Sequence, residues 1–345
     1  MELFIKDTEF INGISSLKNA DAVVTGATGF IGSHLVDYLV EHGGTVHALI
    51  RETSDRKWLN KSDQVKVHVV DLVQSAPISC LQDADYLFHC AGLTKAKTKD
   101  DYFCGNVYSC EVLYERCVAI GNNLKAIVHL SSLAAAGPNV QGEPAQEKKP
   151  CNPVTYYGES KLAGEKIALK YASSLPIVII RPPVVYGPRE KNFFVYLKAL
   201  SQGWNIKIGT TKRELSLVYV TDIVRAMVQA AVCYPQNERM YYVTDGKPYI
   251  WSDISDSAMQ ILNVRAKTLV VPEVLLPFLS GFFEALAWFG AKPALFDRQR
   301  VIDICQTSWI ASPKSFFESH KFQPKYNLVK GLKETIDWGK KNNWL

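Results

Sequence analysis

Ala22-Val23-Val24-Thr25-Gly26-Ala27-Thr28-Gly29-Phe30-Ile31-Gly32 is a short apolar run that ends in a glycine-rich turn, and a helical pattern follows it. Strand, tight turn and helix in this order are typical of a unit that binds a dinucleotide. The first glycine allows the sharp turn, the second lets the backbone approach a pyrophosphate, and the third lets the helix lie close to the sheet. Free N–H groups at the start of the helix also favour phosphate. The residues predicted to hold the dinucleotide are Gly26, Thr28, Gly29, Phe30, Ile31 and Gly32.

The rest of the chain favours this site over an ordinary strand-to-helix turn, because apolar runs keep alternating with helical patterns. Strands are predicted at 22–26, 45–50, 65–70, 85–89, 125–130, 176–181 and 240–244, and helices at 29–42, 103–121 and 156–174. Repeated strand–helix units predict an α/β protein with a doubly wound parallel sheet, that is, a Rossmann fold.

The alternation breaks after Gly187-Pro188, which divides the chain into two predicted domains. Residues 21–186 and 215–246 form the dinucleotide-binding domain. Residues 187–214 and 247–345 form a small, mixed C-terminal substrate domain over the carboxyl edge of the sheet, where open α/β sheets bind ligands. Residues 1–20 are predicted to be an N-terminal extension, to which we assign no function.

Composition argues against several classes of function. The 345 residues include 39 Lys or Arg and 34 Asp or Glu, so the formal net charge is only +5, and there is no basic run. This balance does not indicate a nucleic-acid partner. The eight cysteines lack a CxxC or zinc spacing. We therefore expect buried thiols in a reducing, cytoplasmic compartment, and no metal site. The N-terminus has no pattern of a secretory signal.

The ends of the next strands predict the type of dinucleotide. In an NAD-specific unit an acidic residue near the end of the second strand binds the ribose 2′-hydroxyl. Here Ile50 and then Arg51 stand at this place. A guanidinium suits a 2′-phosphate, so NADP(H) is favoured, with NAD(H) and a merely solvated arginine as the alternative. Further contacts with the cofactor are predicted at Asp71, Leu72, Ala91 and Gly92.

Tyr157-Gly158-Glu159-Ser160-Lys161 carries the sharpest chemical pattern. On a helix Tyr157 and Lys161 are four residues apart and share one face. An ammonium one turn away stabilises a phenolate, which would let Tyr157 act as an acid or base at lower pH. The fifth strand ends in Ser131-Ser132, whose hydroxyls would lie at the same sheet edge and could bind a substrate oxygen.

Together the glycine turn, Ser131-Ser132 and the Tyr157–Lys161 motif resemble the extended short-chain dehydrogenase/reductase superfamily, that is, the NAD-dependent epimerase/dehydratase family. Further matches are Arg181-Pro182-Pro183-Val184-Val185-Tyr186-Gly187-Pro188 and Val220-Thr221-Asp222. The resemblance implies that Tyr157 is the catalytic acid/base and that Lys161 also binds the nicotinamide ribose. It implies that Ser132, five residues before Gly137, orients the reacting oxygen. It also implies that Pro183 and Val184 back the nicotinamide ring.

Within this superfamily the chain is most similar to the 3-beta-hydroxysteroid dehydrogenases and dihydroflavonol reductases. The residues that carry this similarity are Ser131-Ser132-Leu133-Ala134-Ala135-Ala136-Gly137-Pro138-Asn139 and Thr45-Val46-His47-Ala48-Leu49-Ile50-Arg51. Many sugar-nucleotide enzymes carry a diphosphate-binding arginine seven residues before the aspartate that Asp222 matches, but Leu215 stands there. The similarity therefore implies hydride transfer between nicotinamide and a secondary alcohol or ketone of a hydrophobic, steroid-, flavonoid- or 3-oxoacyl-like substrate. A nucleotide-sugar epimerase or dehydratase is the alternative.

The segment 269–290 is unusually apolar. Pro272, Glu273, Pro277 and Glu284 interrupt it and argue against a spanning helix. Four interpretations stay open: a lid over an apolar substrate, a surface for peripheral membrane contact, a surface for a second copy in a homodimer, and packing in the core.

Overall fold

The computed structural model describes residues 16–74, 77–121, 123–139, 142–235, 238–288 and 296–345. Most of the predicted N-terminal extension therefore lies outside the described residues. At its end Leu17 and Ala20 are buried in the core, and the Asn19 N–H donates a 3.0 Å hydrogen bond to the carbonyl of Gly43. The described end of the extension is thus part of the packed fold.

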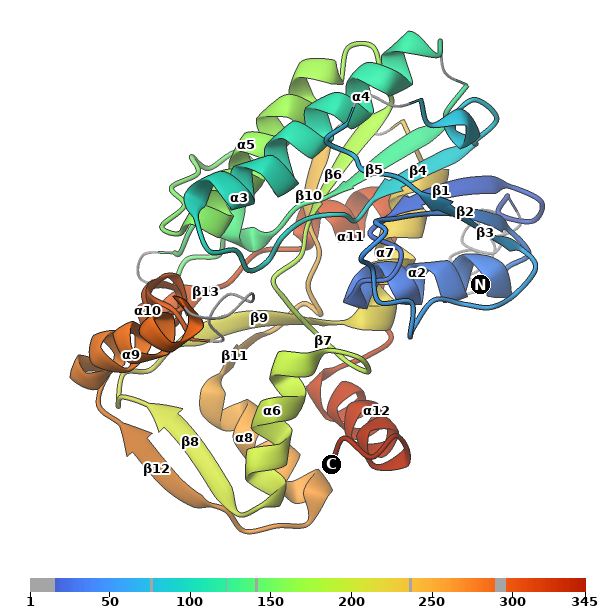
Figure 1. Ribbon diagram of the computed structural model, residues 1–345. Coiled ribbons are helices and arrows are strands. Elements are labelled where there is room, and N and C mark those ends of the chain that lie inside the picture. The colour runs from blue at the N-terminus through green and yellow to red at the C-terminus, as the bar shows by residue number, and fades with distance from the viewer. Residues whose placement is uncertain (1–15, 75–76, 122, 140–141, 236–237, 289–295) are drawn as a thin grey trace.

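A seven-stranded parallel sheet forms the centre of the molecule, in the spatial order β10-β6-β5-β4-β1-β2-β3 (Figure 1). Its strands are β1 (Asp21–Thr25), β2 (Thr45–Ile50), β3 (Val65–Val69), β4 (Tyr86–His89), β5 (Ala126–Leu130), β6 (Ile177–Arg181) and β10 (Met240–Tyr242). Every strand predicted from the sequence is present within a few residues. The predicted α/β Rossmann fold with a parallel sheet is therefore confirmed.

Helices cover both faces of this sheet, because successive side chains of a strand point to opposite faces. Val24 of β1 belongs to the core shared with the helices α2 (Phe30–Glu41), α7 (Val220–Val232) and α11 (Lys314–His320). Val23, one residue earlier, belongs to the core shared with α4 (Ser109–Ala119) and α5 (Tyr156–Tyr171). A π-helical turn, Cys104–Tyr108, joins α4 to the preceding α3 (Lys99–Phe103).

The remaining elements form the C-terminal part of the molecule. Strand β9 (Glu214–Tyr219) pairs with β7 (Val184–Tyr186), β11 (Pro248–Ile250) and β13 (Ser308–Trp309), and β8 (Trp204–Ile208) pairs with β12 (Lys267–Val271). The helices here are α6 (Lys191–Ser201), α8 (Trp251–Leu262), α9 (Leu276–Trp288), α10 (Arg298–Cys305) and α12 (Leu328–Lys341), with a short 3₁₀ turn at Glu273–Leu275. Two further 3₁₀ turns, Ser79–Leu81 and Leu133–Ala135, lie between elements of the central sheet region. The sequence analysis assigned β7 and most of β9 to the dinucleotide-binding domain. The structure pairs both with strands of the other predicted domain, and the division into domains stays a prediction.

The apolar segment predicted at 269–290 spans β12 and α9, and its last two residues lie outside the described part. Phe278, Phe282 and Phe283 are exposed, so packing in the core does not account for their side chains. Among the described residues, helices of the length and apolarity needed to cross a bilayer are absent.

Candidate active site

The candidate active site lies along one edge of the sheet, because parallel strands place their carboxyl ends on the same side. The predicted site residues follow six of these ends: Gly26 after β1, Arg51 after β2, Asp71 and Leu72 after β3, Ala91 and Gly92 after β4, Ser132 after β5, and Pro183 and Val184 after β6. Tyr157 and Lys161 come from the first half of α5. The structure therefore brings the predicted residues to a single edge.

The turn after β1 requires its glycines. Gly26 has a φ of +65°, and a Cβ there would lie 2.8 Å from the backbone nitrogen of Ala91. A Cβ on Gly32 would lie 2.2 Å from the carbonyl oxygen of Gly26, so α2 packs this closely only because Gly32 has no side chain. Gly29 is the N-cap of α2, and no side chain caps that helix. The first turn of α2, with Phe30 and Ile31, is thus open to an anion.

The ends of β1 and β4 are tied together beside this turn. The Thr25 hydroxyl accepts a 3.0 Å hydrogen bond from the N–H of Ala91 and lies 2.8 Å from Nδ1 of His89. His89 is buried, and burial together with the nearby Lys161 ammonium lowers its pKa to about 3. His89 is therefore a neutral core residue that positions the strand end.

Asn106, in the π-helical turn, fixes the loop that follows β4. Its amide nitrogen donates to the carbonyl of Leu93 (3.0 Å) and to the hydroxyl of Ser160 (2.8 Å), and its amide oxygen accepts from the Leu93 N–H (2.6 Å). A Cβ on Gly92 would lie 3.0 Å from that oxygen and 3.8 Å from Nζ of Lys161. Asn106 thus locks this loop to α5.

The two serines after β5 have different partners. The Ser131 hydroxyl donates to the buried carboxylate of Glu165. The Ser132 hydroxyl shares a hydrogen bond with the Tyr157 phenol and accepts another from the N–H of Ala134 at 3.1 Å. The geometry therefore favours Ser132 over Ser131 as the residue that acts with Tyr157.

The protonation of Tyr157 differs from the expectation. Burial raises its pKa to about 12; the Ser132 hydrogen bond acts against this rise, and the nearby Tyr102 and Asp303 add to it. The Lys161 ammonium donates a 2.7 Å hydrogen bond to the carbonyl of Leu130, and burial lowers its pKa. The expected lowering of the Tyr157 pKa is thus wrong for this structure, because burial raises the pKa of the phenol. Tyr157 is a neutral phenol that can donate a proton.

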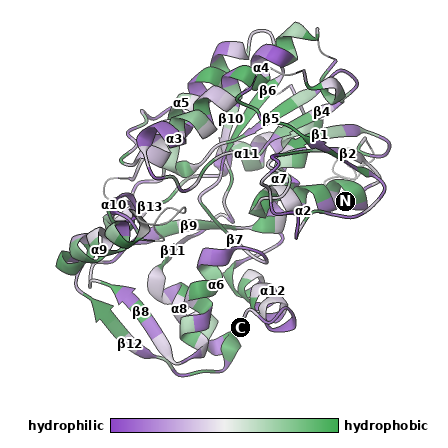
Figure 2. Cartoon of the chain, in the orientation of Figure 1, coloured by the Kyte–Doolittle hydropathy of each residue, from purple (hydrophilic) through white to green (hydrophobic). Residues whose placement is uncertain are grey.

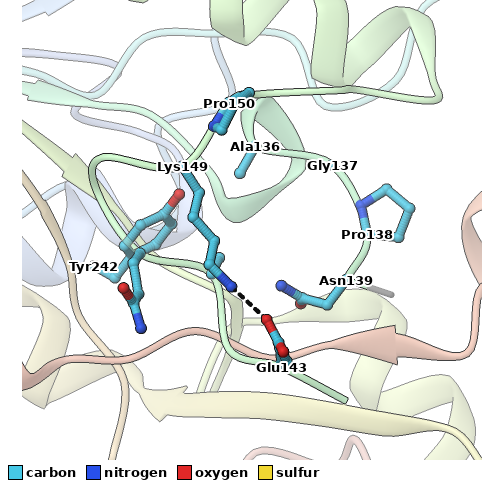
Figure 3. Close-up of a pocket in the computed structure, with 10 residues that line it drawn as sticks. Ala136, Gly137, Pro138, Asn139, Glu143, Lys149, Pro150 and Tyr242 are labelled. Atoms are coloured by element: carbon cyan, nitrogen blue, oxygen red, sulfur yellow. Dashed lines mark hydrogen bonds and ion pairs between the residues drawn. The ribbon is translucent and has the colours of Figure 1, made fainter. Parts of the chain in front are cut away.

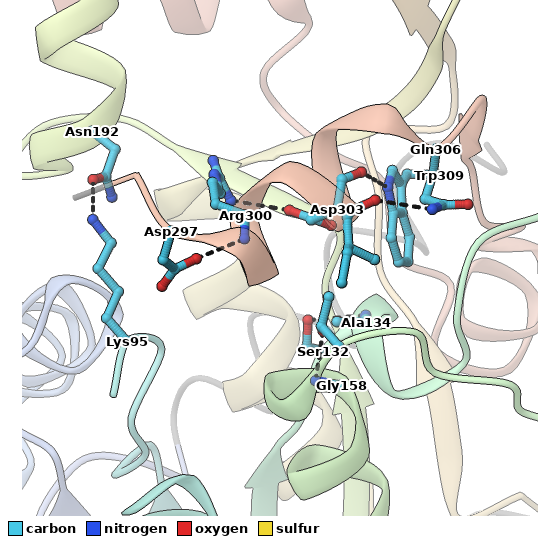
Figure 4. Close-up of polar contacts among 12 residues, drawn as sticks. Lys95, Ser132, Ala134, Gly158, Asn192, Asp297, Arg300, Asp303, Gln306 and Trp309 are labelled. Atoms are coloured by element: carbon cyan, nitrogen blue, oxygen red, sulfur yellow. Dashed lines mark hydrogen bonds and ion pairs between the residues drawn. The ribbon is translucent and has the colours of Figure 1, made fainter. Parts of the chain in front are cut away.

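Helix α10 covers the catalytic end of α5, as Figure 4 shows. The Gln299 side chain accepts a 2.7 Å hydrogen bond from the N–H of Tyr156, which holds α10 against the first turn of α5. Asp303 lies close enough to raise the pKa of Tyr157, and it accepts a 3.1 Å bond from Arg300. Burial raises the pKa of Asp303 itself, and Arg300 acts in the opposite direction.

A lysine from the sheet edge lies near the same helix. Lys95 donates a 2.8 Å bond to Asn192 of α6, and both burial and the nearby Arg300 lower its pKa. Arg300, Asp303 and Lys95 are therefore charged groups over the catalytic edge that sequence analysis missed, since only the folded chain brings α10 to α5.

The predicted adenine end of the site is exposed. Arg51 follows β2, and its guanidinium has no partner among the residues that the structure describes. Asp71 follows the neighbouring β3, but its oxygens accept hydrogen bonds from the Val73 N–H (3.0 Å) and the Gln74 amide (3.1 Å). Arg51 is thus available to a ligand, whereas Asp71 has a local structural role as a turn residue.

A buried ion pair supports the catalytic helix. Arg181, at the end of β6, pairs with Glu165 of α5, and both side chains are 2% exposed. Arg181 also donates a 2.7 Å bond to the hydroxyl of Tyr242 on β10. Two residues later Pro183 and Val184 lead into β7 at the catalytic edge. The pair therefore fixes α5 relative to the strand that carries these predicted ring-backing residues.

A separate pocket lies beside residues 136–139, a few residues after Ser131 and Ser132 (Figure 3). It is lined by Ala136, Gly137, Pro138, Asn139, Glu143, Ala145, Gln146, Lys149, Pro150 and Tyr242, and a 2.7 Å ion pair joins Lys149 to Glu143. Ser132, Tyr157 and Lys161 do not line it. We therefore do not identify it with the catalytic centre.

These features fit a bound nicotinamide dinucleotide. Gly26 and Gly32 allow the close backbone packing that sets the start of α2 at the sheet edge, the uncapped start of α2 suits the pyrophosphate, and Lys161 lies beside the small residue Gly92. Together with Ser132 and Tyr157 they define an enzyme of the short-chain dehydrogenase/reductase class, which acts on CH–OH groups.

The chain belongs to the NAD dependent epimerase/dehydratase family, whose model matches residues 22–241. The names of similar proteins refer to different substrates. Ceramide reductase of Caulobacter vibrioides is 24% identical over 93% of this chain and 95% of its own. UDP-glucose 4-epimerase of Vibrio cholerae is 27% identical over 91% and 93%. A decarboxylating sterol-4-alpha-carboxylate 3-dehydrogenase of Dictyostelium discoideum is 25% identical over 85% and 90%, in agreement with the resemblance to the hydroxysteroid dehydrogenase branch.

Solved structures show the same fold. The UDP-glucose 4-epimerase of Thermotoga maritima, solved with UDP-glucose, has a TM-score of 0.75 at 20% identity and covers 94% of this chain and 99% of its own. The similarity therefore extends to the C-terminal part of the chain.

Proposed function

We propose that this enzyme transfers a hydride between NADP(H) and a secondary alcohol or ketone of an apolar substrate. The observation that carries the substrate class lies at β9. Leu215 stands where a diphosphate-binding arginine is expected in sugar-nucleotide enzymes. The nearby Arg213 is held by Glu273 at 2.6 Å and by the carbonyl of Ile208 at 2.8 Å. A diphosphate needs fixed cations or N–H groups to replace its water, and Arg213 is already engaged.

The proposed chemistry uses three side chains. The bound nicotinamide supplies or accepts the hydride. Tyr157, a neutral phenol with a pKa of about 12, gives its proton to the oxygen of a ketone as that carbon is reduced. Ser132, hydrogen-bonded to Tyr157, orients the same oxygen. Lys161 holds the ribose and keeps a positive charge close to the phenol when Tyr157 must lose its proton.

The NADP preference depends on Arg51. Its exposed guanidinium follows β2 without a partner in the described part of the chain, and a 2′-phosphate would give it a charge-assisted partner. Family membership supports a nicotinamide dinucleotide in general. The choice of NADP(H) over NAD(H) is the finer part of the proposal.

The names of two relatives support an apolar substrate, since ceramide and sterol carboxylates are lipids. A nucleotide-sugar epimerase is the second candidate. The Vibrio relative supports it, and so do Lys95 and Arg300, two cations near the catalytic edge that could hold a phosphate. Both are already engaged, Lys95 with Asn192 and Arg300 with Asp303, which favours the apolar substrate.

The test is a parallel screen of one preparation of the full chain. Titration calorimetry with NADP present would compare sterol, long-chain and aromatic ketones with a panel of nucleotide sugars, and NADPH oxidation would be followed in the same samples. We expect binding and oxidation with the apolar ketones alone. Micromolar binding of a nucleotide sugar, with none from the ketones, would move the protein to the epimerase branch.

A further inference from the structure

The solvent-facing side of helix α9 carries apolar side chains where polar ones are normally found. Val274, just before the helix, and Phe278, Phe282 and Leu286 recur at steps of four residues, and their side chains are 71%, 74%, 60% and 58% exposed. Helical residues four apart lie on one face. On the inner side Leu276 is buried. A helix at a water surface normally turns polar residues outward, so this face needs an apolar partner.

Strand β12, which precedes α9 in the chain, and its partner β8 also expose apolar side chains. Trp204 and Ile206 of β8 lie opposite Lys267 and Leu269 of β12 in the parallel pairing, and all four side chains are exposed. Figure 2 shows β12 and α9 as largely apolar ribbons at the margin of the molecule. We call Trp204, Ile206, Leu269 and the four α9-face residues the α9 surface.

The charges around the α9 surface are unbalanced. The stretches 204–213 and 264–286 contain five cations, Lys207, Lys212, Arg213, Arg265 and Lys267, and two carboxylates, Glu273 and Glu284, and Lys212 is paired with Glu214 at 3.3 Å. Both carboxylates are already neutralised, Glu273 by Arg213 and Glu284 by Arg298. Lys207, Arg265 and Lys267 have no acidic partner in the described part of the chain. The apolar face thus has a cationic margin.

We propose that the α9 surface docks peripherally on an anionic lipid bilayer. Apolar side chains flanked by lysine and arginine are the composition of surfaces that insert among lipid headgroups. A second copy of the chain is a poorer occupant. A two-fold contact places the same patch on both subunits, which would bring the cationic margins together without neutralising them.

Docking would place the catalytic edge close to the lipid. Helix α10 is joined to α9 through the bonds of Glu284 to Arg298, and Gln299 ties it to the start of α5. The edge that carries Tyr157 would then face the membrane in which an apolar substrate is dissolved. This last step rests on the proposed function, whereas the docking itself does not.

The experiment is sedimentation of the full chain with vesicles, without substrate or cofactor. Phosphatidylcholine vesicles with and without phosphatidylserine would be compared. We expect binding to the phosphatidylserine vesicles that weakens in high salt. The double variant Phe278→Ser/Phe282→Ser should bind about tenfold more weakly or worse, since it removes two large apolar side chains. Lys267→Glu should also weaken binding, and it leaves the apolar face intact.

The matched control is Val195→Ser/Val329→Ser, which alters two exposed apolar residues on α6 and α12. Circular dichroism checks that every variant is folded. Wild-type protein that stays in the supernatant with both vesicle types would overturn the proposal. A dimer that the Phe278→Ser/Phe282→Ser variant dissociates would overturn it in favour of a second copy. Because no substrate is present, failure here leaves the proposed hydride transfer untouched, and a failed substrate screen leaves the docking untouched.

Discussion

The central strands and the β8–β12–α9 region are both rich in apolar residues, but they place them in opposite environments. Every residue of β4, β5 and β6 is buried, whereas four of the five residues of β12 are exposed. The central strands are covered by helices on both faces, and the β8–β12–α9 region presents its apolar side chains outward. An apolar run in the sequence can therefore form either a buried core or an exposed surface for an apolar partner. The two are distinguished only by whether other elements of the fold cover the run.

The same contrast divides the chemistry. The sheet edge holds the groups that we propose to bind the dinucleotide and move the proton. The α9–α10 region contributes charges and apolar area over that edge. We therefore expect substitutions at the sheet edge to abolish the reaction or the folding of the chain. Substitutions in the α9–α10 region should only change the rate of the reaction or its pH dependence.

The largest effect is expected at Tyr157. Tyr157→Phe removes the phenol that exchanges the proton, so turnover should fall by about 10²–10⁴-fold. Nucleotide binding, measured by titration of NADPH fluorescence, should be nearly unchanged. The exposed neighbour provides the control, and Tyr156→Phe should keep wild-type turnover. A Tyr157→Phe enzyme that works at the wild-type rate would show that Tyr157 at the sheet edge does not exchange the proton.

The next effect concerns the support of that edge. Glu165→Leu leaves Arg181 buried without its partner, which should lower the free energy of unfolding by about 3–5 kcal/mol. Denaturant unfolding measures this loss. Glu143→Leu breaks the exposed pair with Lys149 and should leave the unfolding midpoint unchanged. Equal stability of the two variants would mean that the buried pair does not hold α5.

A smaller effect is expected at the adenine end. Arg51→Ala should weaken NADPH binding by about 1.5–3 kcal/mol, or ten- to a hundredfold, through loss of a charge-assisted bond to the 2′-phosphate. NADH binding should barely change. Arg265→Ala, which changes an exposed arginine between α8 and β12, is the matched control. If wild type binds NADH more tightly than NADPH, Arg51 is a surface residue only.

The smallest effect tests the α9–α10 region. The Asp303 carboxylate raises the pKa of Tyr157, so Asp303→Asn should lower it and increase the fraction of phenolate at a given pH. Alcohol oxidation, which needs the phenolate, should become a few-fold faster at neutral pH, while ketone reduction should not gain. Asp303→Glu keeps the charge and should restore the wild-type pH profile. A profile that is identical in Asp303→Asn and wild type would show that α10 does not tune the catalytic tyrosine.

Local patterns were sufficient to predict the sheet edge. The glycine turn and the Tyr157–Lys161 spacing lie within single strand–helix units, and the structure places both where the sequence indicated. Asp303 could not be predicted, because α10 meets α5 only after the chain has folded back over more than a hundred residues. The pKa of Tyr157 was predicted in the wrong direction, because helical spacing reports the neighbouring Lys161 but not the burial of the phenol.

The central claim is that the enzyme passes its hydride to an external apolar ketone. The most direct measurement uses NADPH that carries deuterium at C4 of the nicotinamide, incubated with wild-type enzyme and an apolar ketone or a nucleotide sugar, and product analysis by mass spectrometry. We predict deuterium on the carbinol carbon of the apolar alcohol and one oxidised NADP⁺ for each product. Interconversion of the nucleotide sugar without label from free cofactor, and no label in the alcohol, would contradict the account.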